Sequence, residues 1–530
     1  MKRFITLLLL LVSIATTRAY DFMVDDLCYN YNDDGVSVSV TYEVYWSDVN
    51  YSDLNGNLNI PSNVVYNGKN YIVKGIDDSA FARCKGITSV HLPNTIEWIA
   101  RNAFCLCSNL AEIGIPDSVY LIYGGAFYST QWYNNQPDGL VYAGQVAYKY
   151  KGTMPANTSI ILKNGCVGIS EDAFNECVGL VSISIPNSVK SILSGAFRAC
   201  TKLTHITIPN SLIRIDDAFT DCIRLSSVIW NADSCKYANY PFYNSKIETI
   251  VFGNNVKNVP NTLCCGMRKL TNVLIPNSVT NIGDYSFAYC TGLTSIVIPN
   301  NVKAIGNNAF EECSGLTEIN IPNKIQDIKE YTFYNCASLT TINIPNSVKT
   351  IECRAFYGCT GLTSLTIPNS ATYIGYYAFS GCTGLVSLYI PNSLTSIDYF
   401  AFADCIGLKD IYCNIDSPGN VLSNTIFNNI THCNLYVPIG TGLIYYYLFG
   451  GQGFVIMEYD FSEIENVVAD GVKIGVDGLS IVVKGVANPK TTIYDLNGRT
   501  IYKGSQTIIS VPQHGIYIID VNGKKSKILI

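Results

Sequence analysis

The 530-residue chain has few charged side chains and very few histidines. Asp, Glu, Lys and Arg make up 14% of the residues, whereas soluble domains average about 25%. The formal net charge of −6 provides no basic excess to neutralise phosphates, which argues against nucleic-acid binding. Four histidines in the whole chain leave little room for His-based metal sites or acid/base catalysis.

Long apolar runs are also missing, except at the N-terminus. A basic start at Lys2 and Arg3 precedes an apolar run over residues 5–14, and small Ala19 suits a cleavage site. The run is shorter than the roughly 20 residues of a membrane span, so residues 1–19 are predicted to be a secretory signal peptide and not a membrane anchor. Its removal leaves 32 basic against 41 acidic side chains, a net charge near −9. We therefore expect an exported, acidic protein that is not an integral membrane protein.

What the sequence does contain is a repeat. The pair Pro-Asn recurs every 23 residues from Pro276 to Pro391, and a marker Phe keeps the same step. The consensus is L-x-x-I-x-I-P-N-S-V-x-x-I-x-x-x-A-F-x-x-C, intact at residues 339–359. One such turn cannot bury its apolar face alone, but stacked turns bury a continuous core. The predicted fold is a repeat solenoid of about fifteen turns, with a parallel β-sheet and short helical turns, followed by a small β-sandwich.

Most of the twenty cysteines occupy one and the same position of the repeat. Eleven follow the marker Phe by three residues, which predicts a buried ladder of small side chains. Stacked equivalents point the same way, which is poor geometry for a disulfide. Thr130 and Ser245 replace Cys at this position and favour a size requirement. The other nine cysteines could pair in an oxidising envelope. The ladder comprises Cys84, Cys107, Cys177, Cys200, Cys222, Cys290, Cys313, Cys336, Cys359, Cys382 and Cys405.

Departures from the rhythm define the predicted domains. The 47-residue gap between Phe127 and Phe174 contains a hairpin insertion, which is either a binding feature or a replacement for one turn. Terminal caps are expected because the ends of a stack must be covered. The predicted segments are the signal peptide (1–19), an N-terminal β-cap (20–70), the solenoid (71–440) with its insertion at about 128–159, a C-terminal cap (441–462) and the β-sandwich (463–530).

Two outward rows are candidates for partner binding. The unburied strand face is mostly small and polar, so it could dock an extended partner or be a solvated face without a ligand. A second row lies two residues before the marker Phe and carries Tyr285, Tyr331, Tyr377 and Phe400, interrupted by Asn308 and Arg354. Tyrosine is favoured at interfaces, although lateral packing outside the solenoid is the alternative. The candidates are His91, Glu112, His205, Glu318, Asn320, Asn343, Tyr389, Tyr285, Tyr331 and Tyr377.

No catalytic arrangement emerges from the spacing. His91 and His205 are about five coils apart, roughly 24 Å at the ladder spacing, which is too far for a proton relay. His432 precedes Cys433, but adjacent strand residues face opposite sides. Neither a phosphate-binding GxxxxGK[ST] loop nor an EF-hand spacing occurs. We predict no catalytic residue, no cofactor and no metal site, with an atypical hydrolase at Cys433 and His432 as an alternative.

The consensus resembles the BspA-like leucine-rich repeat family of bacterial surface proteins. The cap motif over residues 59–62 and the insertion WYNNQPDGLVYAGQVAYKYKG are similar to that family as well. The tail IYDLNGRTIYKG…VPQHGIYIIDVNGKKSKILI is similar to C-terminal sorting domains of the type used in type IX secretion. These resemblances imply a secreted or surface protein on the outer face of a Gram-negative envelope, with no catalytic residues. They imply binding or adhesion to an extracellular or host surface protein; a glycan-binding or structural envelope role is the alternative.

Overall fold

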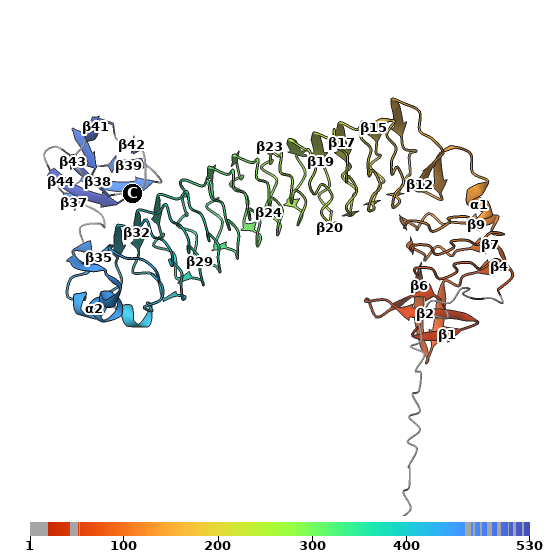
Figure 1. The fold of residues 1–530 in the computed structure, drawn as a ribbon, viewed down its shortest axis with the longest axis horizontal. Helices are drawn as coiled ribbons and strands as arrows, with labels where there is room; N and C mark the ends of the chain where they lie inside the picture. Colours follow the sequence, from red (N-terminus) through yellow and green to blue (C-terminus); the bar gives the residue numbers. More distant parts are fainter. Residues whose placement is uncertain are drawn as a thin grey trace, which may run out of the picture. The chain divides into compact units, whose positions relative to one another are not determined.

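The computed structural model describes residues 20–42, 51 and 54–461 and the strands of the C-terminal part (468–469, 472–477, 480–484, 490–495, 500–506, 508–511, 516–521 and 524–529). The predicted signal peptide lies outside these residues. The chain divides into two compact units (Figure 1). Unit 1 comprises Met1–Gly179 and Pro186–Arg198, and unit 2 comprises Leu180–Ile185 and Ala199–Ile530.

The predicted repeat fold is confirmed. The structure is a parallel-strand β-solenoid of about 17 turns, two more than the sequence suggested. A typical coil has three sides: a first strand ending near the Pro, a second strand of two residues, and a turn segment carrying the marker Phe. In the coil of residues 339–359 the first strand is reduced to an isolated bridge at Asn343. The additional turns lie inside the segments predicted as caps. There, β4 (Gly56–Asn59) pairs in parallel with β7 (Ile87–His91), and β36 (Val455–Tyr459) pairs in parallel with β35 (Asn434–Pro438).

Unit 1 starts with antiparallel strands that lead into the coils. β1 pairs with β2, β2 pairs with β3, and β3 then runs parallel to β6, which continues the second side of the solenoid through β8 and β10. Apart from β4, β7 and the insertion described below, the strands of this unit are β1 (Phe22–Val24), β2 (Leu27–Tyr31), β3 (Ser37–Thr41), β5 (Asn63–Tyr66), β6 (Lys69–Ile76), β8 (Trp98–Ile99), β9 (Glu112–Gly114), β10 (Leu121–Ile122), β13 (Thr158–Ile161), β14 (Gly168–Ile169) and β16 (Ser191–Ile192).

The insertion in unit 1 contains a short helix, α1 (Gln131–Asn134), and a hairpin of β11 (Gly139–Ala143) and β12 (Val146–Lys151). β12 also pairs in parallel with β14, so the hairpin supplies the second-side strand of a coil. The Phe127 amide donates to the Tyr148 hydroxyl over 3.0 Å. In regular coils the marker Phe amide donates to a carbonyl of the next coil. The insertion therefore supplies one strand of a coil and an acceptor for the Phe127 amide.

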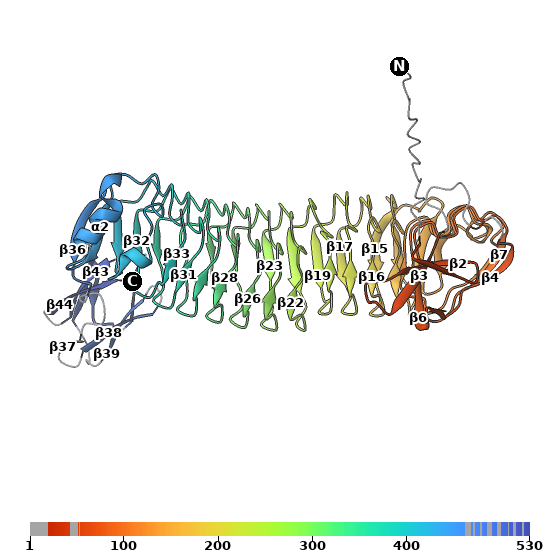
Figure 2. The same cartoon turned by 90° about the horizontal axis from the view of Figure 1, so that it is seen from below.

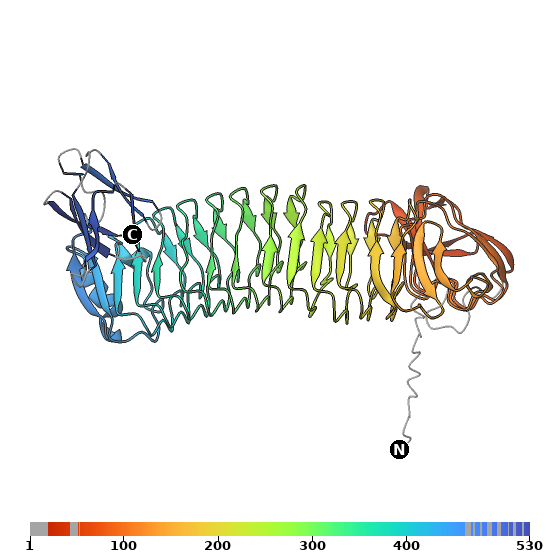
Figure 3. The ribbon, with the colours of Figure 1, turned by 90° about the horizontal axis from the view of Figure 1, so that it is seen from above.

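Unit 2 repeats the coil most regularly. Its first strands form successive parallel pairs, and Figure 3 shows them as a row of parallel arrows. Figure 2 shows the short second strands β22, β26 and β28 following one another. First-side strands besides β35 and β36 are β15 (Leu180–Ser184), β17 (His205–Ile208), β19 (Ser227–Trp230), β21 (Thr249–Phe252), β23 (Asn272–Leu274), β25 (Ser295–Ile296), β27 (Glu318–Ile319), β30 (Ser364–Thr366), β32 (Ser387–Ile390) and β34 (Asp410–Cys413). Second-side strands are β18 (Arg214–Ile215), β20 (Tyr237–Ala238), β22 (Asn258–Val259), β24 (Asn281–Ile282), β26 (Ala304–Ile305), β28 (Asp327–Ile328), β29 (Thr350–Ile351), β31 (Tyr373–Ile374) and β33 (Ser396–Ile397).

The third side of the coil is not helical, which corrects the prediction of short helical turns. In the coil of Phe287, the amides of Tyr285, Phe287 and Tyr289 donate to carbonyls of the next coil, while those of Ala288 and Cys290 donate three residues back. Tyr285 and Tyr289 have left-handed φ angles of 53° and 60°. In a helix the backbone N–H groups donate along the helix axis to carbonyls of the same segment. The A-F-x-x-C spacing resembles a helical apolar period, but with two left-handed residues four positions apart the segment is not helical, and every second amide donates to the neighbouring coil.

The core is built from two side-chain ladders. In unit 2 the marker Phe rings stack on those of the next coil, with centroids 5.0 to 5.7 Å apart from Phe287 to Phe402. The ladder cysteines are buried. Several donate their thiol to the Phe carbonyl of the preceding coil, as Cys336 does to Phe310 over 3.2 Å. The position therefore selects a small side chain with a weak donor. The thiols of the off-ladder Cys105, Cys166, Cys235, Cys264, Cys265, Cys353, Cys413 and Cys433 are free.

The last turn of the solenoid in unit 2 contains a helix before its final strand β36, and antiparallel strands follow it. The helix α2 (Gly442–Phe449) buries Tyr445, whose hydroxyl donates to the Ile415 carbonyl over 2.9 Å. The short 3-10 turns η1 (Pro418–Asn420) and η2 (Gly450–Gln452) lie nearby in the chain. The last strands form two antiparallel sheets of four, the predicted β-sandwich, with a core including Ile493 and Ile519. These strands are β37 (Val468–Ala469), β38 (Val472–Asp477), β39 (Ser480–Lys484), β40 (Thr491–Asp495), β41 (Thr500–Gly504), β42 (Ile508–Ser510), β43 (Ile516–Val521) and β44 (Lys524–Leu529).

Candidate binding surface on the turn segments

The strand-face candidates of unit 1 lie together in a shallow groove. His91 and Glu112 are both exposed and line a hollow of about 580 Å³ with Asn57 and Asn59. The parallel pairing of β7 with β9 brings them close, because Ser89 faces Glu112 and the chain continues to His91. The groove is polar and open, so it can hydrogen-bond a partner but cannot exclude water from it.

The strand-face candidates of unit 2 are less uniform. His205, Glu318 and Asn343 are exposed. Asn320 is exposed too, but its side-chain amide is used within the fold: it accepts from the Ile298 amide over 2.9 Å and donates to the Ile298 carbonyl over 2.8 Å. Its amide therefore completes the ladder between two coils, and its availability to a partner is reduced.

Tyr389 does not lie on an exposed face. Only 7% of its surface is accessible, and it packs in a cluster with Tyr412 and Phe461. The sequence placed it outward because every second residue of the strand alternates sides, and it could not show that the C-terminal end of unit 2 covers this position. The structure thus removes Tyr389 from the accessible candidates.

The second row forms an aromatic surface with an arginine at its centre. Tyr331, Arg354 and Tyr377 occupy the same position in three successive coils of unit 2. The Arg354 guanidinium lies 5.5 Å from the Tyr331 ring centroid and 5.3 Å from that of Tyr377, and it donates to the Tyr331 hydroxyl. Arg354, expected to interrupt the row, instead bridges it. This hydrogen bond is the main reason why the pKa of Arg354 is raised.

Further rings extend this surface, which we call the tyrosine ridge. Tyr334 stacks on Tyr357 with centroids 5.1 Å apart, and Tyr377 stacks on Phe400 at 5.2 Å. Tyr376 contacts the Tyr377 ring edge-on at 4.2 Å. The ridge is defined as Tyr331, Tyr334, Arg354, Tyr357, Tyr376, Tyr377 and Phe400. It presents a continuous half-buried surface of rings over four coils.

The ridge residues sit on a strained backbone. Tyr331, Arg354, Tyr377 and Phe400 have φ between 51° and 61°. A left-handed residue with a side chain costs about 1–2 kcal/mol, and only Gly, Asn and Asp adopt it readily. Asn308, at the equivalent position, shows the residue type that the backbone prefers. Bulky side chains are therefore retained here despite the cost.

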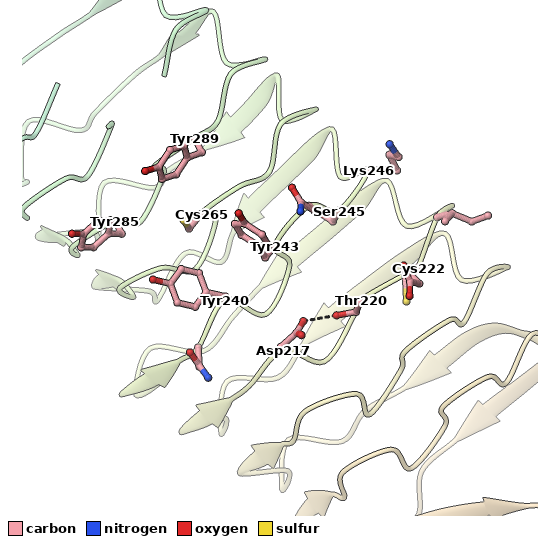
Figure 4. A pocket seen from close by; sticks show the side chains of 14 residues that line it. Asp217, Thr220, Cys222, Tyr240, Tyr243, Ser245, Lys246, Cys265, Tyr285 and Tyr289 are labelled. Atoms are coloured by element: carbon pink, nitrogen blue, oxygen red, sulfur yellow. Dashed lines mark hydrogen bonds between the residues drawn. The ribbon is translucent and has the colours of Figure 1, made fainter. Parts of the chain in front are cut away.

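A larger hollow lies on the same side of unit 2, closer to its N-terminal end. This groove has a volume of about 960 Å³ and is lined by four tyrosines, Tyr240, Tyr243, Tyr285 and Tyr289. Figure 4 shows Cys265 between the tyrosines of the two flanking coils. We refer to it as the tyrosine groove.

The groove exists because one coil carries small outward side chains. In this coil Thr262, Cys265 and Gly266 occupy the positions that Tyr240, Tyr243 and Asn244 occupy in the preceding coil. A Cβ atom at Gly266 would lie 2.5 Å from the Tyr243 ring, and its φ is 74°. Glycine therefore allows both the left-handed turn and the position of the Tyr243 ring over this coil.

Among the charged side chains that line the groove, acidic ones outnumber basic ones. Asp217 and Asp221 line it with a single lysine, Lys246. The Asp217 carboxylate accepts a hydrogen bond of 2.6 Å from Thr220 (Figure 4). At the other wall, the Tyr289 hydroxyl donates to Glu311 over 3.3 Å. Desolvation and the charge of Glu311 raise the pKa of Tyr289 to about 12, so this hydroxyl stays protonated.

The structure does not combine Cys433 and His432 into a reactive pair. The Cys433 side chain is buried and its thiol donates to the Asn434 carbonyl over 3.5 Å, while His432 is exposed. Burial raises the pKa of Cys433 to about 12, which suppresses the thiolate. Among the described residues, no group of three or more His, Cys, Asp or Glu side chains is arranged to hold a metal ion.

Sequence comparison assigns the chain to a family. Residues 57–134, 144–267, 259–353 and 326–454 match the BspA type leucine rich repeat region, with six copies. These matches cover more than half of the chain, and it belongs to the BspA-type leucine-rich repeat family. Members of this family are typically binding scaffolds and not enzymes.

Two solved structures illustrate the similarity. A leucine-rich repeat protein from Bacteroides ovatus is 27% identical, with 83% of this chain and 100% of that chain covered and a TM-score of 0.47. A leucine-rich cell surface protein from Faecalibacterium prausnitzii is 25% identical, with 69% of this chain and 93% of that chain covered and a TM-score of 0.31. A search of curated proteins gave no match.

Sequence reasoning missed the residues that make the groove and half of the ridge. Of the aromatic residues concerned, it named Tyr285, Tyr331, Tyr377 and Phe400, all two residues before the marker Phe. Of the others, Tyr243, Tyr334 and Tyr357 follow that position by three residues and Tyr289 by four, where the expected helical turn gave no reason to look outward, while Tyr376 precedes it by one and Tyr240 occupies it before Phe242. Aligning the coils on the marker Phe would have shown both rows. The missed residues are Tyr240, Tyr243, Tyr289, Tyr334, Tyr357 and Tyr376.

Proposed function

We propose that the chain is an exported or cell-surface module that binds an extracellular or host surface protein through the turn segments of unit 2. The observation that carries the proposal is the tyrosine ridge. Tyr and Arg are enriched among the side chains that contribute most to protein–protein affinity. Their retention on a left-handed backbone, at about 1–2 kcal/mol per residue, supports a role outside the fold.

The form of the surface favours a macromolecular ligand. The ridge is half-buried and continuous over four coils, and the polar strand face of the same coils adds exposed hydroxyl and amide groups. A partner that spans several coils can sum many modest contacts, as repeat proteins do. Binding, and not catalysis, is the activity that we propose.

Three features support a location outside the cell. They are the predicted signal peptide at residues 1–19, the family membership, and the tail that resembles a sorting domain. Within the described part of the chain, no helix combines the length and apolar character needed to cross a membrane. We propose export across the outer membrane of a Gram-negative cell, with the C-terminal β-sandwich as the sorting signal.

The proposal is tested with the chain from residue 20 to 530 on arrays of extracellular-matrix and cell-surface proteins. We expect saturable binding to a protein, weakened at least about tenfold by Tyr331→Ala together with Tyr377→Ala. The matched control is Tyr128→Ala, which removes an exposed tyrosine of unit 1. Absence of binding to any surface protein would refute the proposed function.

Glycan binding is a second candidate. Exposed tyrosine rings beside Asp and Asn side chains, as in the tyrosine groove, are suited to the apolar face and the hydroxyl groups of a sugar. A glycan array with the same protein separates the two candidates. Binding confined to glycans, with none to proteins, would favour a glycan-handling or structural envelope protein.

A further inference from the structure

In the row two residues before the marker Phe, two tyrosines from different coils twice flank a central residue, and the central residue differs between the two places. In three successive coils it reads Tyr331, Arg354, Tyr377, and nearer the N-terminal end of unit 2 it reads Tyr240, Thr262, Tyr285. All these residues share the left-handed backbone, with φ between 48° and 56°. The flanking tyrosines therefore have equivalent backbone positions in the two motifs, and the motifs differ in the central side chain.

In the first case the space between the tyrosines is filled by this chain. The Arg354 guanidinium lies 5.5 and 5.3 Å from the two ring centroids and donates to the Tyr331 hydroxyl. A guanidinium suits this position because its charge is attracted to the ring faces and its planar N–H groups reach the hydroxyl.

In the second case the central side chain leaves the space open. The Thr262 hydroxyl donates to the Ala238 carbonyl and accepts from the Tyr240 amide over 3.3 Å, so it turns back to the preceding coil. Position 265 holds Cys where the Arg354 coil has Tyr357, which widens the space further. The result is the tyrosine groove of about 960 Å³.

The intervening motif, Tyr285, Asn308, Tyr331, supports the comparison because it is closed in another way. The Asn308 side chain is buried and donates to Glu311 over 2.9 Å. Glu311 in turn accepts from the Tyr289 hydroxyl. Asn308 and its carboxylate partner Glu311 thus occupy the space between Tyr285 and Tyr331. Of these three motifs, the one centred on Thr262 opens into the groove.

The charges around the groove fit a cation. Asp217 and Asp221 lie in its lining and Glu311 borders its far wall, against one lysine, Lys246. A carboxylate at the rim can pair with a guanidinium whose plane lies against a tyrosine ring. The groove thus combines two tyrosines at the positions that flank Arg354 in the ridge with carboxylates in its own lining.

We propose that the tyrosine groove accepts an arginine side chain of the extracellular protein partner between Tyr240 and Tyr285, with the carboxylates of Asp217 and Asp221 in the lining favouring its positive charge. The inference rests on the proposed function for the source of the arginine. It adds the chemical class of the recognised group and its location. The partner's guanidinium takes in this groove the place that Arg354 takes in the ridge.

The test uses the chain from residue 20 to 530 and two small probes, Nα-acetyl-arginine amide and its neutral isostere Nα-acetyl-citrulline amide. Ligand-observed NMR titration measures both. We expect saturable binding of the arginine probe and at least about tenfold weaker binding of citrulline, because the attraction to rings and carboxylates needs the charge. Equal binding of the two probes, or binding of neither, would overturn the proposal.

Variants test the place of binding. Thr262→Arg is expected to fill the groove from within, as Arg354 does in the ridge, and to weaken the arginine probe at least about tenfold. Tyr237→Arg is the matched control, since it adds the same charge at an exposed position of β20 outside the groove and should leave binding unchanged. Circular dichroism checks that both variants fold. If Thr262→Arg folds and binds the probe like the parent, the site lies elsewhere and the proposal fails.

The proposed function can fail separately. If the chain captures a surface protein and Thr262→Arg leaves that capture intact, the arginine slot is refuted while the binding module stands. If no surface protein is captured but the arginine probe binds selectively, the slot stands and the proposed function falls. A glycan whose binding is abolished by Thr262→Arg, without selective binding of the arginine probe, would reassign the groove to sugars.

Discussion

The inner and outer side chains of the turn segments follow different rules. The inner Phe and Cys recur from coil to coil, because each must fill the same space between its neighbours. The outer position two residues before the Phe holds Thr262, Tyr285, Asn308, Tyr331 and Arg354 on one and the same left-handed backbone. Constant side chains therefore mark the core, and variable side chains on a constant backbone mark the surface where function can reside.

The largest expected effect concerns thiol reactivity. Burial raises the pKa of the inner Cys359 and of Cys433 to about 12, from 9.0. The thiolate fraction is then lower by about three orders of magnitude, and both side chains are covered. In the native protein we expect a thiol reagent to modify the partly exposed Cys105 and Cys353 first. Peptide mapping by mass spectrometry measures this order, and rapid labelling of Cys433 would revive the hydrolase alternative.

Removing an inner ring should cost the most stability. Phe310 is fully buried between Phe287 and Phe333, with centroids 5.5 and 5.7 Å away. Phe310→Ala is expected to destabilise the solenoid by about 3–5 kcal/mol, because it leaves a cavity in a continuous stack. Urea unfolding measures the change, with the outer Tyr289→Ala as the comparison. Equal costs for the two variants would break the distinction between inner and outer rows.

The cysteine ladder should tolerate changes of chemistry better than changes of size. Cys336→Leu is expected to cost about 1–3 kcal/mol through overpacking. Cys336→Ser keeps the size and a donor for the Phe310 carbonyl, now 3.2 Å from the thiol, and should cost less. The same unfolding assay ranks the two variants. A larger loss for Ser than for Leu would show that apolar character, and not volume, is selected at this position.

The outer arginine should contribute a smaller amount. Arg354→Ala removes the guanidinium from the Tyr331 and Tyr377 rings and is expected to lower the free energy of unfolding by about 1 kcal/mol. A double-mutant cycle with Tyr331→Ala isolates the coupling between the two side chains. Strict additivity would mean that the contact does not stabilise the fold and that Arg354 is held there for another reason.

The smallest effect on stability is expected at Tyr285. Tyr285→Asn places a residue that tolerates the left-handed φ of 53°, so stability should change little or rise by up to about 1 kcal/mol. The groove would lose one wall, and binding of the arginine probe should weaken. Thermal unfolding and the probe titration measure the two effects. A clear loss of stability would instead favour lateral packing as the role of the outer tyrosines.

Much of the fold could be predicted from particular residues. The consensus at residues 339–359 predicted the inward Phe and Cys, because each coil repeats the same burial problem, although the strand before Pro345 is reduced in this coil to a single bridge at Asn343. The helical turn was wrong, since an apolar spacing of three to four residues does not reveal the sign of φ at Tyr285 or Arg354. Tyr389 was placed outward by strand alternation, and the packing of Tyr412 and Phe461 against it covers that face.

By itself, the sequence determined which side chains fill the core and in what period, because stacked coils put residues about 23 positions apart into the same surroundings. Only the tertiary structure decided what the outer side chains do. Whether Arg354 interrupts a row or bridges it, and whether Thr262 leaves a groove, depends on how rings from adjacent coils lie across the central position. Those contacts join residues that are distant in the chain, and their directions follow from a left-handed backbone that no local pattern encodes.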